Sequence, residues 1–277
     1  MNPEELFKVI HDLMQAGSME ELEKVLNNHP ELLGEEVDDL LLRLASTARE
    51  DGDTNAGNLF SQIRELLQTA RASRESSRDE SGLSAILEEL SRPARLVDMP
   101  KRIDLCQRAL ELVSRERNAE LWAALQNDLA NSLAQSPQGD RAENIEQAIE
   151  RYSLALKIYT QKDFPEQWAT IQNNLALAYW SRIKGDRAEN IELAIEHYSL
   201  ALKIYTPKGF PNRCRGTSYR LGNLFLEVQR YSPAADAYIM GMEAVEELYR
   251  ASIFQASREA ELAETRDLYR RAGYVLG

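Results

Sequence analysis

The chain has 277 residues, of which 43% are hydrophobic and 28% are charged, so it can bury a large apolar core beneath charged helix surfaces. Its net charge of −12 argues against a nucleic-acid partner, because binding to phosphate backbones requires clustered Lys and Arg. No segment approaches the roughly 20 apolar residues that span a bilayer, and the acidic start has no apolar leader. The two cysteines give no disulfide framework. These features predict a cytoplasmic protein without a membrane partner.

The first 70 residues are predicted to form a small helical segment with an acidic surface. Residues 1–40 contain eleven acidic residues and two lysines. Apolar residues recur at helical spacing, which places helices near residues 3–16, 18–28, 35–50 and 53–70. Residues 71–82 are polar, rich in Ser and Arg, and without apolar periodicity, which indicates a linker. Residues 83–277 would then form a separate domain.

A segment of 22 residues occurs almost twice in this second part. Residues 139–160 and residues 185–206 agree at 20 of 22 positions, at an offset of 46 residues. The offset holds from about residue 100 to about residue 226, and the spacing then shortens because the next copy lacks the GDRAEN insertion. A fixed period of tens of residues is typical of stacked repeats, in which each unit buries its apolar face against the next.

Each repeat is predicted to be a helical hairpin. Apolar residues of the second helix recur at steps of three and four: Ile145, Ala148, Ile149, Tyr152, Leu156 and Tyr159. The first helix carries a stripe of its own, formed by Trp168, Ile171, Leu175 and Tyr179, and we expect Trp168 and Tyr179 to be largely buried. Asp140 and Glu143 have the spacing of a capping box, and the second copy repeats it. Pro165 and Pro211 suit the first turn of a helix, where a missing N–H costs nothing.

The spacing of large and small residues resembles the tetratricopeptide repeat. The best match has Leu-Gly and an aromatic residue, then Ala, an aromatic and a small residue: Leu221, Gly222, Phe225, Ala234, Tyr238 and Gly241. A second unit matches with about six more residues between its helices: Leu175, Ala176, Tyr179, Ala194, Tyr198 and Ala201. A third is Leu129, Ala130, Leu133, Ala148, Tyr152 and Ala155. The resemblance implies an all-α helical-hairpin solenoid, preceded by the small helical segment, whose work is to bind other proteins.

The amino-acid sequence of the insertion restricts this resemblance to a narrower group of repeat proteins. GDRAENIEQAIERYSLALKIYT joined to FPEQWATIQNNLALAY is similar to the long repeats of bacterial proteins that carry a C-terminal caspase-like (CHAT) peptidase domain. The resemblance covers about residues 83–277 and implies the sensor or regulatory portion of a CHAT-type system. The alternative is a stand-alone adaptor that forms a homodimer through an uncapped C-terminal helix, whose apolar residues are Leu268, Tyr269, Ala272, Tyr274 and Val275.

No group of residues in the sequence indicates an active site. His197 stands where the previous repeat has Arg151, so it is predicted to be a solvated helix position. Cys106 and Cys214 stand where other repeats have Tyr152 and Trp168, which predicts packing rather than catalysis. Neither His and Cys pairs at metal-ligand spacing nor glycine-rich phosphate loops occur. We therefore expect a non-enzymatic protein that needs no cofactor or metal.

Recognition of a protein or peptide is the remaining function, and the first helices of the hairpins are its predicted site. In tetratricopeptide arrays these helices line the concave groove, and asparagines there can bond both N–H and C=O of an extended peptide. The predicted partner-binding residues are Asn127, Asn131, Asn173, Asn174, Tyr219, Arg220 and Asn223. The resemblance adds that Asn131, Asn174 and Arg220 suit the carboxylate clamp of chaperone-binding members. Asn127 and Gly216 replace its lysines, so that clamp is incomplete.

Overall fold

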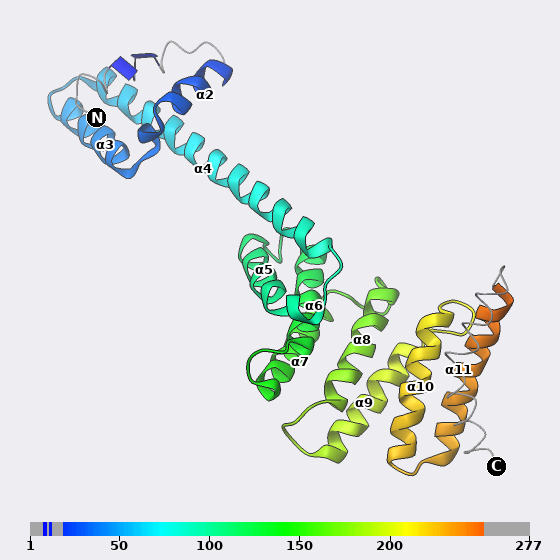
Figure 1. Cartoon of the computed structure of the whole chain (residues 1–277). Coiled ribbons are helices and arrows are strands. Elements are labelled where there is room, and N and C mark those ends of the chain that lie inside the picture. Colours follow the sequence, from blue (N-terminus) through cyan, green and yellow to red (C-terminus); the bar gives the residue numbers. More distant parts are fainter. Residues whose placement is uncertain (1–7, 10, 13–18, 252–277) are drawn as a thin grey trace. The chain divides into compact units, whose positions relative to one another are not determined.

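The structure, a computed structural model, describes residues 8–9, 11–12 and 19–251 of the chain. Within these residues all regular secondary structure is helical, and no strand occurs, so the predicted all-α fold class is confirmed. Contacts between residues divide the chain into two compact units, Met1–Ala85 and Ile86–Gly277, named here the first and second unit. Figure 1 shows the helices of both units.

The first unit is built from short amphipathic helices. They are α2 (Met19–Asn28), the 3-10 helix η1 (Pro30–Leu33), α3 (Glu35–Glu50) and the first part of α4 (Thr54–Ser91). Their apolar faces meet in one cluster, which is formed by Val9, Leu26, Leu32, Val37, Leu41, Ile63 and Leu67. Arg64 of α4 donates to both carboxylate oxygens of Asp38 on α3, at 2.9 and 2.8 Å. This bidentate pair fixes the register of the two helices.

Helix α4 corrects the prediction that a helix ends at residue 70 and a linker follows. Residues 71–82 are helical and lie inside α4, and the boundary between the units falls later in the same helix, after Ala85. The physical reason is that Ala, Arg, Glu and Ser continue a helix even without an apolar stripe, and no proline interrupts them. The predicted helices at 18–28 and 35–50 agree with α2 and α3. The one predicted near residues 3–16 lies mostly outside the described residues.

The second unit is an array of helical hairpins. It contains η2 (Leu96–Asp98), α5 (Met99–Leu112), α6 (Ala119–Gln135), α7 (Arg141–Ala155), α8 (Pro165–Trp180), α9 (Arg187–Leu202), α10 (Pro211–Glu227) and α11 (Tyr231–Ala251). The closest neighbours are the two helices of each hairpin: α6 with α7, α8 with α9, and α10 with α11. Prolines begin α8 and α10, as predicted.

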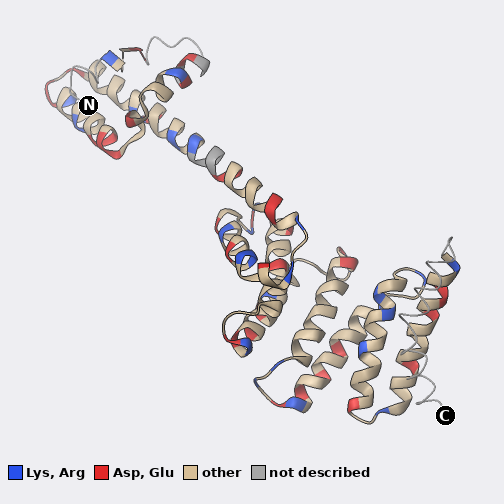
Figure 2. Ribbon diagram, in the orientation of Figure 1, with Lys and Arg blue, Asp and Glu red and all other residues tan. Residues whose placement is uncertain are grey.

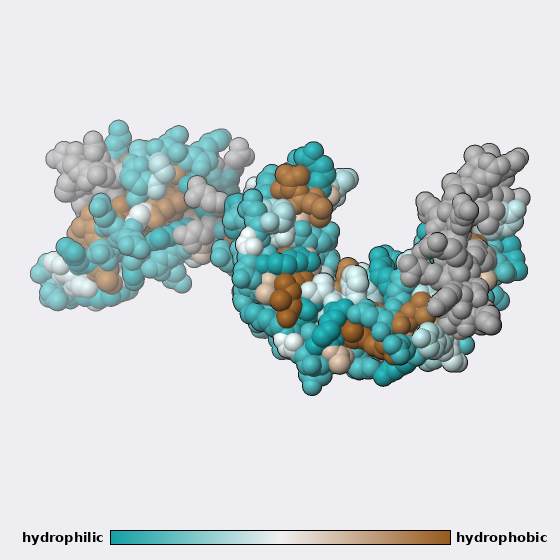
Figure 3. All heavy atoms as spheres, turned by 60° about the horizontal axis from the view of Figure 1, so that its bottom comes forward, coloured by the Kyte–Doolittle hydropathy of each residue, from teal (hydrophilic) through white to brown (hydrophobic). Residues whose placement is uncertain are grey.

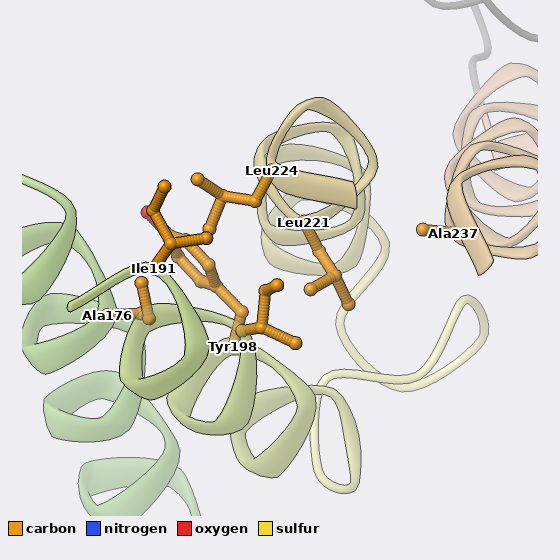
Figure 4. Packing of buried hydrophobic residues seen from close by; sticks show 8 residues of the cluster. Ala176, Ile191, Tyr198, Leu221, Leu224 and Ala237 are labelled. Atoms are coloured by element: carbon orange, nitrogen blue, oxygen red, sulfur yellow. The ribbon is translucent and has the colours of Figure 1, made fainter. Parts of the chain in front are cut away.

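A small residue on the first helix lets the tyrosine of the second helix pack closely in each hairpin. Ala130, Ala176 and Gly222 hold the same position on α6, α8 and α10, and each of these residues is buried. The tyrosines Tyr152, Tyr198 and Tyr238 are at most 2% exposed. Figure 4 shows Tyr198 packed beside Leu221 and Leu224 of α10, so the same ring also joins one hairpin to the next.

The apolar stripe predicted for α8 is only partly buried. Ile171 and Leu175 are 1% and 2% exposed, as expected for a core position. Trp168 and Tyr179 are only half-buried, so the expectation of largely buried aromatics is wrong for these two residues. Both rings pack against the edge of a buried cluster, Trp168 beside Cys214 and Tyr205, and Tyr179 beside Tyr198.

The two GDRAEN segments build the same turn. Gly139 and Gly185 have φ of +82° and +80°, a left-handed conformation that costs other residues about 1–2 kcal/mol. Asp140 then caps α7, because its side chain accepts hydrogen bonds from the backbone N–H groups of Ala142 and Glu143. Asp186 caps α9 in the same way. The Asp caps are confirmed, but no described bond returns from Glu143, so the reciprocal half of the predicted capping box is absent.

The Arg and Asn of GDRAEN tie this turn to the helix before it. Arg141 donates to the carbonyl oxygen of Ala134 at the end of α6, and Arg187 donates to that of Trp180 at the end of α8. Asn144 donates to the carbonyl of Gln138 at 2.7 Å, and its counterpart in the next repeat does the same. The arginines thus satisfy carbonyl groups that a helix end leaves without partners. The strict repetition of these letters therefore has a structural cause.

Candidate partner-binding face

The predicted partner-binding residues lie on the first helices of three successive hairpins. α6 carries Asn127 and Asn131, α8 carries Asn173 and Asn174, and α10 carries Tyr219, Arg220 and Asn223. Six of them are half-buried, and Arg220 is exposed. They therefore lie at or near the surface, as predicted, although several are occupied by contacts within the array.

A chain of hydrogen bonds through the asparagines connects these three helices and also reaches α7. The hydroxyl of Thr217 on α10 donates to Asn173 Oδ1 at 3.0 Å, and Asn173 Nδ2 donates to Asn174 Oδ1 at 3.2 Å. Asn174 Nδ2 in turn donates to Asn131 Oδ1 on α6 at 2.9 Å. The same oxygen accepts a 2.7 Å bond from the hydroxyl of Tyr152 on α7. This network, Thr217–Asn173–Asn174–Asn131–Tyr152, crosses from one hairpin to the next.

The network gives the asparagines a structural role that the sequence did not reveal. Each side-chain amide has two donors and one acceptor oxygen, and those of Asn131 and Asn174 are already engaged with neighbours. Replacing Asn174 would leave partners on two helices without their bonds. Binding of a peptide by these amides remains a prediction, and a variant of Asn174 would change stability as well as binding.

Asn127 differs from the other asparagines. It is half-buried, and its Oδ1 is a buried acceptor without a hydrogen-bond partner among the described residues. Arg151 Nε is a buried donor in the same condition. The other end of Arg151 donates to Gln126 Oε1 at 3.5 Å, which links α7 to α6.

A pocket of about 590 Å³ opens where α6 and α8 end, and it is named here the α6–α8 pocket. Its polar lining includes Asn131, Asn174 and Arg141. Its apolar lining includes Leu96, which is 60% exposed, and Leu177, which is 41% exposed. Hydrogen-bonding groups thus lie beside accessible apolar side chains in one hollow.

A second pocket of about 260 Å³, the α8–α10 pocket, lies between the next two first helices. It is lined by Trp180, Tyr198, Tyr219, Arg220, Asn223, Leu224 and Glu227. Three predicted binding residues therefore meet there, on α10. Arg220 has no hydrogen bond or ion pair to the residues that the structure describes. Glu227 is paired with Arg187 at 2.9 Å, which offsets its charge.

Trp180 lines both pockets and separates them. It is the last residue of α8 and is 44% exposed, and its indole Nε1 lies 3.5 Å from Glu227 Oε2. The sequence does not predict a role for this residue, because the neighbouring repeats have Ala134 and Leu226 at the same position, so no aromatic residue recurs there. A large aromatic residue at a helix end, without a match in the neighbouring repeats, is the signal that could have found it. Figure 3 shows apolar patches on this unit that are bordered by polar surface.

His197 corrects another sequence prediction, because it is half-buried rather than solvated. Its Nδ1 lies 2.6 Å from Gln172 Oε1, and its ring stacks on Tyr179 with the centroids 5.3 Å apart. Burial lowers the pKa of His197 below its ordinary value, although the nearby Glu196 raises it. The pair of Gln172 and His197 stands where the previous repeat pairs Gln126 with Arg151, so it joins the two helices of a hairpin.

The two cysteines confirm the packing role that their repeat positions predict. Both are fully buried. Burial raises the pKa of the Cys106 thiol to about 12, and it raises that of Cys214 as well, so both remain protonated near neutral pH. Neither thiol is poised as a nucleophile. Figure 2 shows acidic and basic residues interspersed over the helices of this unit.

One known protein family matches the helices that form this face. The sequence model of the soluble NSF attachment protein (SNAP) family matches residues 106–252, which is more than half of the chain. The chain belongs to this family. The match covers the second half of α5 and all of α6–α11, which supply most of the lining of both pockets. No curated protein matches the chain.

The family is one of helical, non-catalytic adaptors that bind protein partners. The match is consistent with the tetratricopeptide-like arrangement, whereas the narrower resemblance to repeats associated with CHAT peptidases receives no support from it. None of the helices within the described residues is long and apolar enough to cross a bilayer.

Proposed function

We propose that this protein is a non-enzymatic adaptor that holds a protein partner on the face around Trp180. The observation that carries the proposal is the position of this residue: a half-exposed indole between two pockets, each lined by hydrogen-bonding side chains. Membership of a family of protein-binding adaptors supports it.

The chemistry of the face suits a protein partner. Tryptophan, tyrosine and arginine dominate the energetics of protein interfaces, since they combine a large apolar contact with a polar group. Trp180, Tyr219 and Arg220 all line the α8–α10 pocket. Leu96 and Leu177 supply further accessible apolar area in the α6–α8 pocket. An anchor from the partner could therefore enter either pocket while packing against the indole.

The test is capture of partners from the native cell with the whole chain as bait. The wild-type protein and the Trp180→Ala variant would be compared by quantitative mass spectrometry. We expect specific partners to be lost with Trp180→Ala, because truncation of an interface tryptophan often costs 2 kcal/mol or more of binding energy, a loss of about thirtyfold.

Tyr231→Ala serves as the matched control, since Tyr231 is an aromatic residue that is 54% exposed at the start of α11 and lines neither pocket. Partners retained by this control and lost by Trp180→Ala support the proposal. If the wild type, Trp180→Ala and Tyr231→Ala all capture the same partners, the binding face does not include Trp180.

A more specific proposal is that the protein acts together with a CHAT-type peptidase. It is supported by the amino-acid sequence of the repeats alone. A peptidase of this class among the captured proteins, or in a continuation of the same gene, would bear it out. The alternative homodimer depends on Leu268, Tyr269, Ala272, Tyr274 and Val275, which lie outside the described residues. A mass that rises with concentration would favour that alternative.

A further inference from the structure

The three hairpins differ in what holds the hydroxyl of the tyrosine on the second helix. The Tyr152 hydroxyl donates to Asn131 Oδ1 at 2.7 Å, and the Tyr238 hydroxyl donates to Asn223 Oδ1 at the same distance. In the middle hairpin the residue that corresponds to Asn131 is Leu177, which has no acceptor. The Tyr198 hydroxyl accordingly has no hydrogen-bond partner among the described residues.

Tyr198 as a residue is only 1% exposed, but the buried polar side-chain atoms without a partner among the described residues are Asn127 Oδ1 and Arg151 Nε, so the Tyr198 hydroxyl reaches the surface of a pocket. Burial raises the pKa of Tyr198 to about 12, while the charge of Arg220 acts in the opposite direction. The phenol therefore remains a hydrogen-bond donor at neutral pH. A hydroxyl whose partner is solvent can exchange that solvent for an acceptor on a ligand at little cost.

Tyr198 and Arg220 both line the α8–α10 pocket. The guanidinium folds back along α10, and its Nη1 would lie 3.6 Å from a Cβ placed on Gly216. Among the described residues that line the pocket, Glu227 alone carries a carboxylate, and it is paired with Arg187. Within the part of the chain that the structure describes, one small hollow is thus lined by a guanidinium and a phenol that have no bonded partner.

We propose that the α8–α10 pocket binds the side-chain carboxylate of a glutamate on the partner, held by the Tyr198 hydroxyl and the Arg220 guanidinium. This deepens the proposed function and rests on it. One guanidinium suits one carboxylate, whereas a phosphate carries more charge than this pocket offsets. The methylene groups of a glutamate would pack between Trp180 and Tyr219. The pocket volume of about 260 Å³ accommodates one such side chain.

The probe is N-acetylglutamate α-amide, whose only charge is the side-chain carboxylate, titrated into the whole protein. The reporter is the indole N–H signal of Trp180 in ¹H–¹⁵N spectra, which is readily assigned because the chain has three tryptophans. We expect a saturable shift with the glutamate derivative and none with neutral N-acetylglutamine amide. N-acetylleucine, which offers a terminal carboxylate, is expected to bind at least several-fold more weakly.

Four variants make the assignment specific. Arg220→Gln should weaken binding about 10-fold to 100-fold, as loss of a charged hydrogen bond does, and Tyr198→Phe should weaken it about 2-fold to 10-fold. Leu177→Asn restores the acceptor that the other hairpins have, so it should occupy the Tyr198 hydroxyl and weaken binding as much as Tyr198→Phe. Tyr152→Phe removes the same hydroxyl from the neighbouring hairpin and should leave binding unchanged.

The proposal is overturned if the glutamate and glutamine derivatives shift the signal alike, if no shift saturates, or if Arg220→Gln binds as the wild type does. A preference for N-acetylleucine would overturn the side-chain assignment in favour of a terminal carboxylate. These outcomes are separate from the capture experiment, in which Trp180→Ala tests the adaptor face itself. If captured partners are lost with Trp180→Ala but retained with Arg220→Gln, the adaptor function is supported and the proposed glutamate site is wrong.

Discussion

Two glycines on the same helix α10 meet opposite surroundings. A Cβ on Gly222 would lie 2.6 Å from Cε1 of Tyr238, a buried ring whose hydroxyl is fixed by Asn223. Among the described residues, the closest atom to a Cβ on Gly216 would be Arg220 Nη1, at 3.6 Å. The first glycine is therefore required by packing, whereas the second only adds conformational freedom to the unfolded chain.

We predict that Gly222→Ala destabilises the protein by about 1–3 kcal/mol, because the Tyr238 ring must move in a filled core. Gly216→Ala should instead stabilise it by about 0.5–1 kcal/mol. Urea titration followed by circular dichroism measures both values. Equal effects of the two substitutions would show that Tyr238 can shift without cost.

The buried His197 predicts a dependence of stability on pH. Because burial lowers its pKa below 6.5 in the folded state, the unfolded chain binds the proton more readily. The stability that neutral His197 contributes is therefore complete above about pH 6.5 and decreases as the pH falls towards the folded-state pKa.

His197→Gln keeps a hydrogen-bonding side chain near Gln172 but cannot titrate. We expect the free energy of unfolding of the wild type, relative to this variant, to be largest near pH 7.5 and to decrease towards pH 5. Comparing the two proteins cancels the titration of all other groups. A difference that grows at low pH would mean that Glu196 keeps His197 charged in the folded state.

The repetition in the sequence predicts which residues pack in the core, but it does not predict the role of residues that occur in one repeat only. The tyrosines and their small partners recur with the repeat, so their burial could be predicted. The sequence predicts that the asparagines bind a partner, because a single sequence does not show that Asn131 and Asn174 bond to each other across two hairpins. Trp180 and the unpaired Tyr198 hydroxyl arise where one repeat departs from the others, at Leu177 and at the end of α8.

Successive hairpins are joined by two equivalent ion pairs. Arg182, after α8, donates to both carboxylate oxygens of Glu146 on α7, at 2.8 and 2.7 Å. One repeat later, Arg230 makes the same bidentate contact with Glu192 on α9, at 3.0 and 2.6 Å. The side chains of the first pair are 27% and 24% exposed, whereas those of the second are 47% and 50% exposed.

This difference in exposure predicts a difference in energy, because solvent screens an exposed pair more effectively. Double-mutant cycles with Glu→Gln and Arg→Met substitutions should give a coupling of about 1 kcal/mol or more for Glu146 with Arg182. The coupling of Glu192 with Arg230 should be about 0.2–0.5 kcal/mol. The two cycles serve as controls for each other, and equal values would show that exposure does not set the strength of these contacts.

The hairpins and their Asp caps could be read from the sequence, whereas the extent of α4 could not. Helix caps, prolines and glycines with positive φ are local features, because the residue type at each of these positions determines the conformation of the adjacent backbone. Residues 71–82 have no apolar stripe, which predicts a linker, although the structure has a helix there. Arg, Ala and Glu in this segment favour a helix whereas Ser, Asp and Gly favour it less, so the composition does not distinguish a helix from a linker.

At the scale of the whole molecule, the last turns of α4 belong to the second unit. Ile86 and Leu90 are 6% and 7% exposed. Arg102 of α5 donates to the carbonyl oxygen of Leu90 at 2.9 Å, and Lys101 pairs with Glu89 at 2.6 Å. The end of α4 thus covers the apolar edge of the hairpin array, as a capping helix does in other repeat proteins.

A pair of shortened chains tests this role and the predicted domain boundary together. The chain 83–277 keeps the end of α4 and should fold with the helicity expected for its length, since its core is complete. The chain 92–277 lacks Ile86 and Leu90 and should be less stable by about 3–6 kcal/mol, from the burial of two large aliphatic side chains. Denaturant titration of both chains measures the difference. Equal midpoints would show that α4 contributes nothing to the second unit, and failure of 83–277 to fold would place the boundary of the array earlier than residue 83.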